Sequence, residues 1–197
     1  MVKKTERRII GLTGGIATGK STVSEYLASQ YSLPVLDADI YARLAVEKGS
    51  DVLELIAQRY GSKILLSDGM LNRPALGKVI FSDPDEKHWL EQQIHPFVRD
   101  KFQQETALFP TAQTLVYSIP LLFEANLTHL VTEVWVVFCG PHQQKKRLMA
   151  RNQLSAEDAQ TRIEAQMAIE EKCDRADFVL DNSGSKEALF AQVDALL

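Results

Sequence analysis

The sequence predicts an α/β fold in which helices cover a five-stranded parallel sheet, giving three layers. Three observations lead to this prediction. Short apolar, β-branched runs alternate with stretches of helical spacing, a glycine-rich segment joins the first run to the first helix, and a long helical stretch separates the second and third runs. The expected strands are residues 8–13, 34–37, 115–119, 134–138 and 178–180.

The stretch between the second and third strands indicates a helical insertion. Residues 38–60 have helical spacing with a break at Gly49-Ser50, and residues 64–70 predict a small strand or a turn around Asp68-Gly69. We therefore expect a helical insertion between the second and third long strands of the sheet.

A long helix is expected to begin at Asp83. Pro84 suits the first helical position, and Glu86 completes a capping box with Asp83. Pro96 must kink or interrupt this helix, since proline removes one backbone hydrogen bond.

The last third of the chain predicts two more helices. Pro141 can start a helix that runs through Arg151, and the capping box at residues 155–158 precedes a helix to about Cys173. In this alternating pattern, ligands gather beyond the carboxyl ends of the strands.

Composition narrows the function classes. The 197 residues fit one large domain or one core with an inserted subdomain, and a net charge of −4 argues against a nucleic-acid-binding surface. No segment approaches the length of a membrane span, and the apolar run after Lys3, Lys4, Arg7 and Arg8 is too short for a signal peptide. We therefore expect a cytoplasmic protein with no nucleic-acid or membrane partner.

The two cysteines indicate a reduced compartment rather than a metal site. Cys139 and Cys173 are far apart and form no CxxC or Cys/His cluster. Cys139 ends an apolar strand, where it is expected to be a small core residue.

Residues 14–21 match the phosphate-loop pattern G-x-x-x-x-G-K-[ST] in full. Glycines let successive backbone N–H groups converge on phosphate oxygens, and the following helix adds its N-terminal dipole. Lys20 can reach the β- and γ-phosphates, and the Ser21 hydroxyl can ligate Mg²⁺. The strand, loop and helix order predicts a P-loop NTPase-type fold. A bland glycine-rich turn is the alternative.

Asp37-Ala38-Asp39 closes the second strand, at the same end of the sheet as the phosphate loop. Alternate strand positions share a face, so both carboxylates are expected to approach the nucleotide–Mg²⁺ site. One could accept a proton from an attacking hydroxyl, and the other could orient metal-bound water or substrate. The alternative for each is a helix cap.

Cations near the triphosphate are expected from the two later helices. Arg147 and Arg151 share a helix face, and Arg162 follows in the next helix. They could close over ATP and neutralise charge on the transferred group, or they could be part of a solvated charged face.

Four further residues are weaker candidates. Glu124, after the third strand, could approach the metal or substrate, and the loop at Asn182 could bracket the adenine ring. Arg73 and His95 fall in the insertion, where a lone histidine beside aromatic residues is more often packed than a ligand.

These motifs occur together, in order, in one family. The ordered set closely resembles the dephospho-CoA kinase family over nearly the whole chain. One departure is Ala17-Thr18, where the family usually has Gly-Ser; phosphate binding is expected to survive it. The motifs are residues 12–21, Asp37-Ala38-Asp39, His95-Pro96, residues 120–124, Gln166 with residues 170–172, and residues 176–182.

The resemblance implies a single P-loop kinase domain over residues 1–197, with a helical substrate-binding insertion at about 40–110 and a small lid at about 141–172. It implies transfer of the γ-phosphoryl group of ATP, with Mg²⁺, to the ribose 3′-hydroxyl of dephospho-CoA. This is the last step of coenzyme A synthesis. The enzyme is expected to be a monomer or a weak homo-oligomer.

The resemblance also implies roles for individual residues. The implied catalytic residues are Asp39 (the base), Lys20 and Arg147 (a lid cation, with Arg151), and Ser21 is the metal ligand. The implied nucleotide-binding residues are Gly14, Gly15, Ile16, Ala17, Thr18, Gly19, Lys20, Ser21, Thr22, Arg147, Arg151 and Asn182. The candidate substrate-binding residues are Asp37, Asp39, Arg73, His95, Glu124, Arg162 and Gln166, of which the resemblance itself supplies Arg73, His95 and Gln166.

Two alternative functions remain at this point. Another small-molecule or nucleoside-monophosphate kinase would share the fold and the loop. A regulatory GTP-binding switch is a remote alternative, because residues 181–184 fit D-x-x-G only at the chain's end and no Asn-Lys-x-Asp guanine motif occurs.

Overall fold

The computed structural model describes residues 7–197 and divides into two compact units. The core unit holds residues 7–37 and 109–197 of the described chain, and the insertion unit is Ala38–Leu108. Lys3 and Lys4, named above with the signal-peptide alternative, lie outside the described residues. No helix among residues 7–197 is long and apolar enough to cross a membrane.

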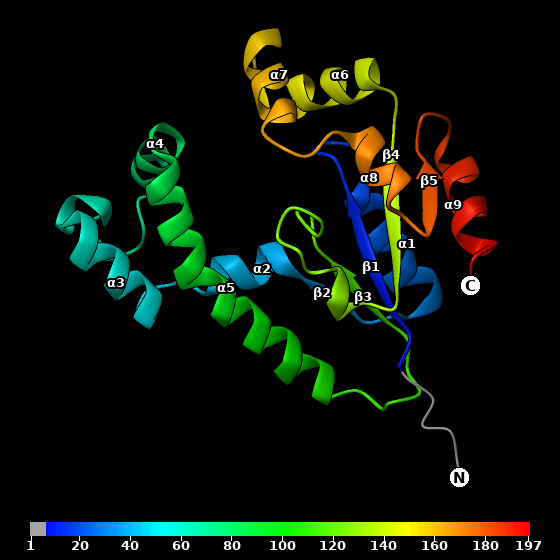
Figure 1. The fold of residues 1–197 in the computed structure, drawn as a ribbon, viewed down its shortest axis with the longest axis horizontal. Helices are drawn as coiled ribbons and strands as arrows, with labels where there is room; N and C mark the ends of the chain where they lie inside the picture. The colour runs from blue at the N-terminus through cyan, green and yellow to red at the C-terminus, as the bar shows by residue number, and fades with distance from the viewer. Residues whose placement is uncertain (1–6) are drawn as a thin grey trace. The chain divides into compact units, whose positions relative to one another are not determined.

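The core unit is built on the predicted five-stranded parallel sheet (Figure 1). Its strand order is β2-β3-β1-β4-β5, and every neighbouring pair is parallel. The order places β1 at the centre, so the segment that follows β1 emerges at the middle of the carboxyl edge. The strands are β1 (Ile9–Gly14), β2 (Val35–Asp37), β3 (Leu115–Ser118), β4 (Glu133–Phe138) and β5 (Phe178–Asp181).

Helices cover both faces of this sheet. Helices α1 (Lys20–Tyr31) and α9 (Lys186–Asp194) pack on one face, over a buried core that includes Leu12 and Trp135. Thr13 alternates with Leu12 and so faces the other side, where α8 (Ile169–Asp174) packs against β4. Cys139, just after β4, is buried as predicted, and this burial raises the pKa of its thiol.

The remaining core helices lie beyond the carboxyl end of β4. Helix α6 (Pro141–Asn152) starts there and packs against α7 (Ala156–Glu164), as Figure 1 shows. A short 3₁₀ helix, η2 (Thr128–Leu130), precedes β4. This α6–α7 pair lies within residues 141–172, for which a small lid is expected.

The insertion unit is helical and has its own apolar core, which includes Ile56 and Leu90. A turn with Gly69 at φ 82° and the antiparallel bridge Leu65–Leu71 confirm the small irregular element predicted at residues 64–70. The helices are α2 (Ala38–Leu44), α3 (Asp51–Tyr60), η1 (Ser62–Ile64), α4 (Arg73–Ser82) and α5 (Pro84–Ala107).

Helix α4 is absent from the predicted elements, although its start signals are in the sequence. The Asn72 side chain caps it by accepting a hydrogen bond from the N–H of Ala75 at 3.1 Å, and Pro74 occupies the first turn. Asn followed by Arg-Pro is therefore the signal that could have found this helix.

Helix α5 begins where predicted but differs in two details. Asp83 caps it through the N–H groups of Asp85 and Glu86, whereas the Glu86 side chain pairs with Arg59 and Tyr60 instead of completing the capping box. The helix also runs through Pro96 without interruption. Buried residues on both sides of the proline, such as Leu90 and Phe102, hold the two halves in one packed element.

The single helix predicted from Ser155 to about Cys173 is wrong, because two helices form. Helix α7 ends at Glu164, and α8 begins at Ile169. The N–H of Met167 bonds to the Glu124 carboxylate at 3.1 Å instead of to a carbonyl one turn earlier. A tertiary contact thus replaces the helical one in the connector, residues 165–168.

Candidate active site

The phosphate loop, residues 14–21, has the curled form that its sequence predicts. Gly19, just before α1, has φ 109°, a left-handed conformation that favours glycine, and a Cβ there would overlap the amide nitrogen of Asn182. The N–H and hydroxyl groups of Thr18 both bond to the carbonyl of Gly15, at 3.2 and 2.9 Å. These bonds close the curl ahead of the helix N-terminus.

Ala17 occupies a position in this loop that favours glycine. Its φ is 62°, in the left-handed region where a Cβ costs about 1–2 kcal/mol. Ala17 therefore has a strained backbone, but the hydrogen bonds inside the loop still form with Ala17-Thr18 in place of Gly-Ser.

Lys20 lies against two side chains from neighbouring strands. Its ammonium donates to the Ser118 hydroxyl at 2.5 Å and lies 3.6 Å from Oδ2 of Asp37. The Ser118 hydroxyl in turn donates to that same Oδ2 at 2.7 Å. The parallel pairing of β2 with β3 sets Asp37 directly opposite Ser118, which explains the cluster. Ser118 was not predicted as a site residue, although its place at a strand's carboxyl end was a usable signal.

The expected alternation of Asp37 and Asp39 along one strand is wrong. Strand β2 ends at Asp37 and helix α2 begins at Ala38, so the two carboxylates do not follow the two-residue period of a strand. Asp37 belongs to the core unit, and Asp39 lies in the first turn of α2 in the insertion unit. The helix start separates their environments.

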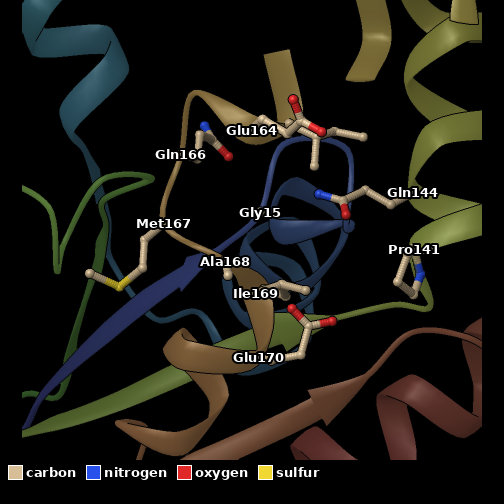
Figure 2. A pocket seen from close by; sticks show the side chains of 10 residues that line it. Gly15, Pro141, Gln144, Glu164, Gln166, Met167, Ala168, Ile169 and Glu170 are labelled. Carbon is tan, nitrogen blue, oxygen red and sulfur yellow. The ribbon is translucent and has the colours of Figure 1, made fainter. Parts of the chain in front are cut away.

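Two glutamines hold the peptide group on either side of Ile16. The Gln166 carbonyl accepts the N–H of Ile16 at 2.8 Å, and the Gln144 amide donates to the Ile16 carbonyl at 2.9 Å. Figure 2 shows these side chains approaching the phosphate loop from two sides. A Cβ at Gly15 would lie 2.6 Å from the Gln144 amide nitrogen, so glycine makes this approach possible. Gln144, which is buried, was missed by sequence reasoning because nothing local marks its partner.

Asn182 and Arg147 hold the other end of the loop. The buried Asn182 amide donates to the Thr18 carbonyl at 2.7 Å. The Arg147 guanidinium donates to the Asn182 carbonyl at 3.1 Å and to the Thr18 carbonyl at 3.5 Å. Two of the predicted nucleotide-binding residues are therefore brought to the loop, where they contact its backbone.

A cavity of about 300 Å³ adjoins the loop (Figure 2). Gly15, Gln144 and Gln166 form its loop side, and Met167 with the start of α8 forms another wall. Glu124, which is expected near the metal or substrate, pairs with the buried ammonium of Lys172 at 2.8 Å. The structure thus gives Glu124 a partner within the protein.

The other predicted arginines of the lid are solvent-exposed. Arg151 on α6 donates to the neighbouring Asn152 side chain at 2.8 Å, and Arg162 is exposed on α7. Both are available to an anionic ligand without breaking a buried contact.

The insertion unit has a cavity of its own, of about 470 Å³. Asp39, Arg43 and Arg73 contribute charged side chains to its lining, and the rest is largely apolar. His95 is exposed on α5 and is not among the lining residues, although its neighbour Ile94 is. The structure therefore brings Asp39 and Arg73 to one cavity and leaves His95 outside it.

Comparisons with known proteins agree with this arrangement. Residues 8–188 match the family model described as dephospho-CoA kinase. A dephospho-CoA kinase of Trichormus variabilis is 59% identical over 191 residues, which cover 97% of each chain. The crystal structure of TT1252 from Thermus thermophilus superposes with a TM-score of 0.84 at 36% identity, covering 98% of this chain and 97% of that one.

A second solved structure extends the comparison. The dephospho-CoA kinase from Campylobacter jejuni has a TM-score of 0.70 at 29% identity, covering 95% of this chain and 96% of that one. The family predicted from the ordered motifs is thus confirmed over most of the chain. The chain belongs to the dephospho-CoA kinase family of P-loop kinases.

Proposed function

We propose that this protein transfers the γ-phosphoryl group of ATP to the ribose 3′-hydroxyl of dephospho-CoA, the step that completes coenzyme A. Membership of the family carries this proposal, and the intact phosphate loop agrees with it. Phosphoryl transfer depends on positioning and charge neutralisation, because the protein forms no covalent intermediate.

The core unit binds ATP through the phosphate loop. Backbone N–H groups of the phosphate loop other than those of Ile16 and Thr18, together with the start of α1, attract the phosphates, and Lys20 supplies a point charge. In the structure Lys20 is held by Ser118 and Asp37, so its ammonium already lies at the loop. The bond between the γ-phosphorus and its bridging oxygen breaks, and ADP leaves.

The donor set at the loop fits Mg²⁺. The Ser21 hydroxyl is exposed at the start of α1, and a carboxylate, Asp37, lies beside Lys20. Within residues 7–197 no cluster of three His, Cys, Asp or Glu side chains could hold a metal by itself. One hydroxyl and one carboxylate suit Mg²⁺, which takes most of its ligands from phosphates and water. Bound there, the ion would neutralise charge on the phosphates.

The insertion unit binds the acceptor. Asp39 lines its cavity and accepts the proton of the ribose 3′-hydroxyl as that oxygen attacks the γ-phosphorus. Arg73, on the same lining, binds the diphosphate of dephospho-CoA. His95 remains a weaker candidate for contacts outside the cavity.

The lid supplies further positive charge. Arg147 is already bonded at the loop, and the exposed Arg151 and Arg162 can turn toward the triphosphate. Their guanidinium groups neutralise charge that develops on the transferred phosphoryl group. We expect a cytoplasmic protein that is a monomer or a weak homo-oligomer. Light scattering measures the mass in solution and so tests the oligomeric state.

The test compares a series of acceptors by two readouts. ADP formation is measured with dephospho-CoA, adenosine monophosphate, shikimate and gluconate as acceptors, and phosphorus NMR locates the new phosphate on the product. We expect turnover with dephospho-CoA and a 3′-phosphate on the ribose. Absence of turnover with dephospho-CoA would contradict the proposal.

A further inference from the structure

Lys172 is a fully buried cation for which the proposed chemistry has no use. Its side chain, on α8, has an exposed fraction of 0%. Its ammonium donates to the carbonyl of Pro120 at 3.1 Å and to Oε1 of Glu124 at 2.8 Å. Buried ion pairs often add nothing to stability compared with apolar packing, because both charges lose their water. Another role is needed to explain the pair.

The first link runs from Glu124 to the connector between α7 and α8. Oε1 of Glu124, the atom that bonds to Lys172, also accepts the backbone N–H of Met167 at 3.1 Å. The other carboxylate oxygen, Oε2, is buried and makes no hydrogen bond with the described residues. Lys172 is thus the one cation paired with Glu124 in the described chain, and it determines where Oε1 lies.

The second link runs from the connector to the phosphate loop. Gln166 precedes Met167, and its side-chain carbonyl accepts the N–H of Ile16 at 2.8 Å. The connector is not helical, so its position depends on tertiary contacts such as the one from Met167 to Glu124. A shift of Met167 would move Gln166 away from the loop.

The carbonyl of Pro120 ties the same ammonium to β1. It accepts both the Lys172 ammonium and the Thr13 hydroxyl, the latter at 3.0 Å. Thr13 directly precedes Gly14, where the phosphate loop begins. Lys172 is therefore connected to the loop twice, through Thr13 at its start and through Gln166 at Ile16.

We propose that Lys172 is a positioning residue for ATP binding: its ammonium fixes Glu124, Glu124 fixes the connector, and the connector holds Gln166 on the phosphate loop. The proposal rests on the ATP-binding role of that loop. In this role the Lys172–Glu124 pair serves ATP binding rather than stability. The N–H groups of the loop bind phosphate well only when they are already fixed in position.

The test uses Lys172→Met, Gln166→Ala and the double variant. Calorimetry measures the ATP Kd of each variant, and thermal unfolding measures its Tm. Lys186→Met, on exposed α9, is the matched control, and its ATP Kd should equal that of the wild type. We expect each of Lys172→Met and Gln166→Ala to raise the Kd for ATP by about 10-fold, the worth of a hydrogen bond to a fixed group. The double variant should be no weaker than Lys172→Met alone, because both changes release the same contact.

Two results would overturn the proposal. One is a lower Tm for Lys172→Met with an unchanged ATP Kd, which indicates a structural role only. The other is an ATP Kd of the double variant that is raised by the product of the two single-variant factors. If Lys172→Met does not fold, Lys172→Met/Glu124→Gln removes both charges of the pair together and carries the same expectation for the ATP Kd. Direct ATP binding is independent of the acceptor, so failure of the proposed kinase reaction would show separately, as missing turnover in the wild type.

Discussion

The phosphate loop of the core unit and the cavity of the insertion unit are built in opposite ways. The loop is held by hydrogen bonds to its backbone from side chains more than 120 residues away along the chain: Gln144, Gln166 and Asn182. The cavity is shaped by largely apolar packing from helices that are neighbours in sequence, with Asp39 and Arg73 on its lining. A triphosphate requires fixed donors, whereas a long acceptor requires shape and a few charges.

The comparison separates the consequences of substitution. Changes in the loop and its supports should lower the affinity for ATP and weaken the neutralisation of charge on the transferred phosphoryl group. Changes in the cavity should act on the acceptor. Two predictions on turnover test this division and two on stability test how each unit is held, beginning with the largest effect.

Asp39→Asn should lower kcat by about 10²-fold or more, because the amide cannot take the acceptor's proton. The Kd for ATP should stay near the wild-type value, since Asp39 belongs to the insertion unit. Steady-state kinetics with dephospho-CoA and calorimetry with ATP measure the two quantities. Near-normal kcat in this variant would remove Asp39 from the role of base.

Lys20→Ala should lower kcat by about 10²-fold and also lower the affinity for ATP, since the loop loses its point charge. Ser118→Ala is a useful companion, because it removes the hydroxyl that bonds to both Lys20 and Asp37 while leaving the ammonium in place. Its effect should be much smaller. Equal losses in the two variants would mean that the hydroxyl, and not the ammonium charge, dominates.

Acid should weaken the insertion unit through Glu86. Hydrogen bonds from Arg59 and then Tyr60 lower the pKa of Glu86 to about 2, from 4.5. Because the folded-state pKa is depressed, this contribution to stability is present above pH 4.5 and is lost as the pH falls toward 2. Glu86→Gln should flatten that part of the unfolding profile.

The fluorescence of Trp89 can follow this transition locally. The Arg59 guanidinium lies 4.5 Å from the Trp89 ring, and the chain has 2 tryptophans, the other being Trp135 in the core unit. In a Trp135→Phe background, emission therefore reports the insertion unit. An identical pH profile with and without Glu86→Gln would contradict the assignment.

The smallest predicted effect is at Ala17. Replacing it with glycine should stabilise the fold by up to about 1 kcal/mol, because the left-handed φ of 62° no longer carries a Cβ. Thermal unfolding measures the change. Ala38→Gly, at the start of α2, is a control expected to destabilise. A destabilised Ala17→Gly protein would mean that glycine's extra freedom in the unfolded chain outweighs the strain.

Local patterns predicted most of the core unit. The phosphate loop, its flanking strand and helix, and the five strands could be read because each has a short-range signal in glycines, caps or apolar runs. The insertion was also predicted as helical, although α4 was missed despite its Asn72 cap.

Contacts between distant residues could not be predicted. The break between α7 and α8 arises because Glu124 takes the N–H of Met167, a pairing that no local pattern announces. The burial of Lys172 and the clamp by Gln144 have the same origin. Asp39 shows a further limit, because β2 ends at Asp37 as predicted and the two-residue period of a strand does not extend to a residue of the following helix.

The most direct test of the division between the units is a set of four dissociation constants. ATP and dephospho-CoA are each titrated into Lys20→Ala and Arg73→Gln, with the wild type as reference. We predict that Lys20→Ala weakens ATP by about 10-fold or more and changes dephospho-CoA little, and that Arg73→Gln does the reverse, since each removes a charge-assisted bond to one ligand. If either variant weakens both ligands equally, the two units do not bind the two substrates separately.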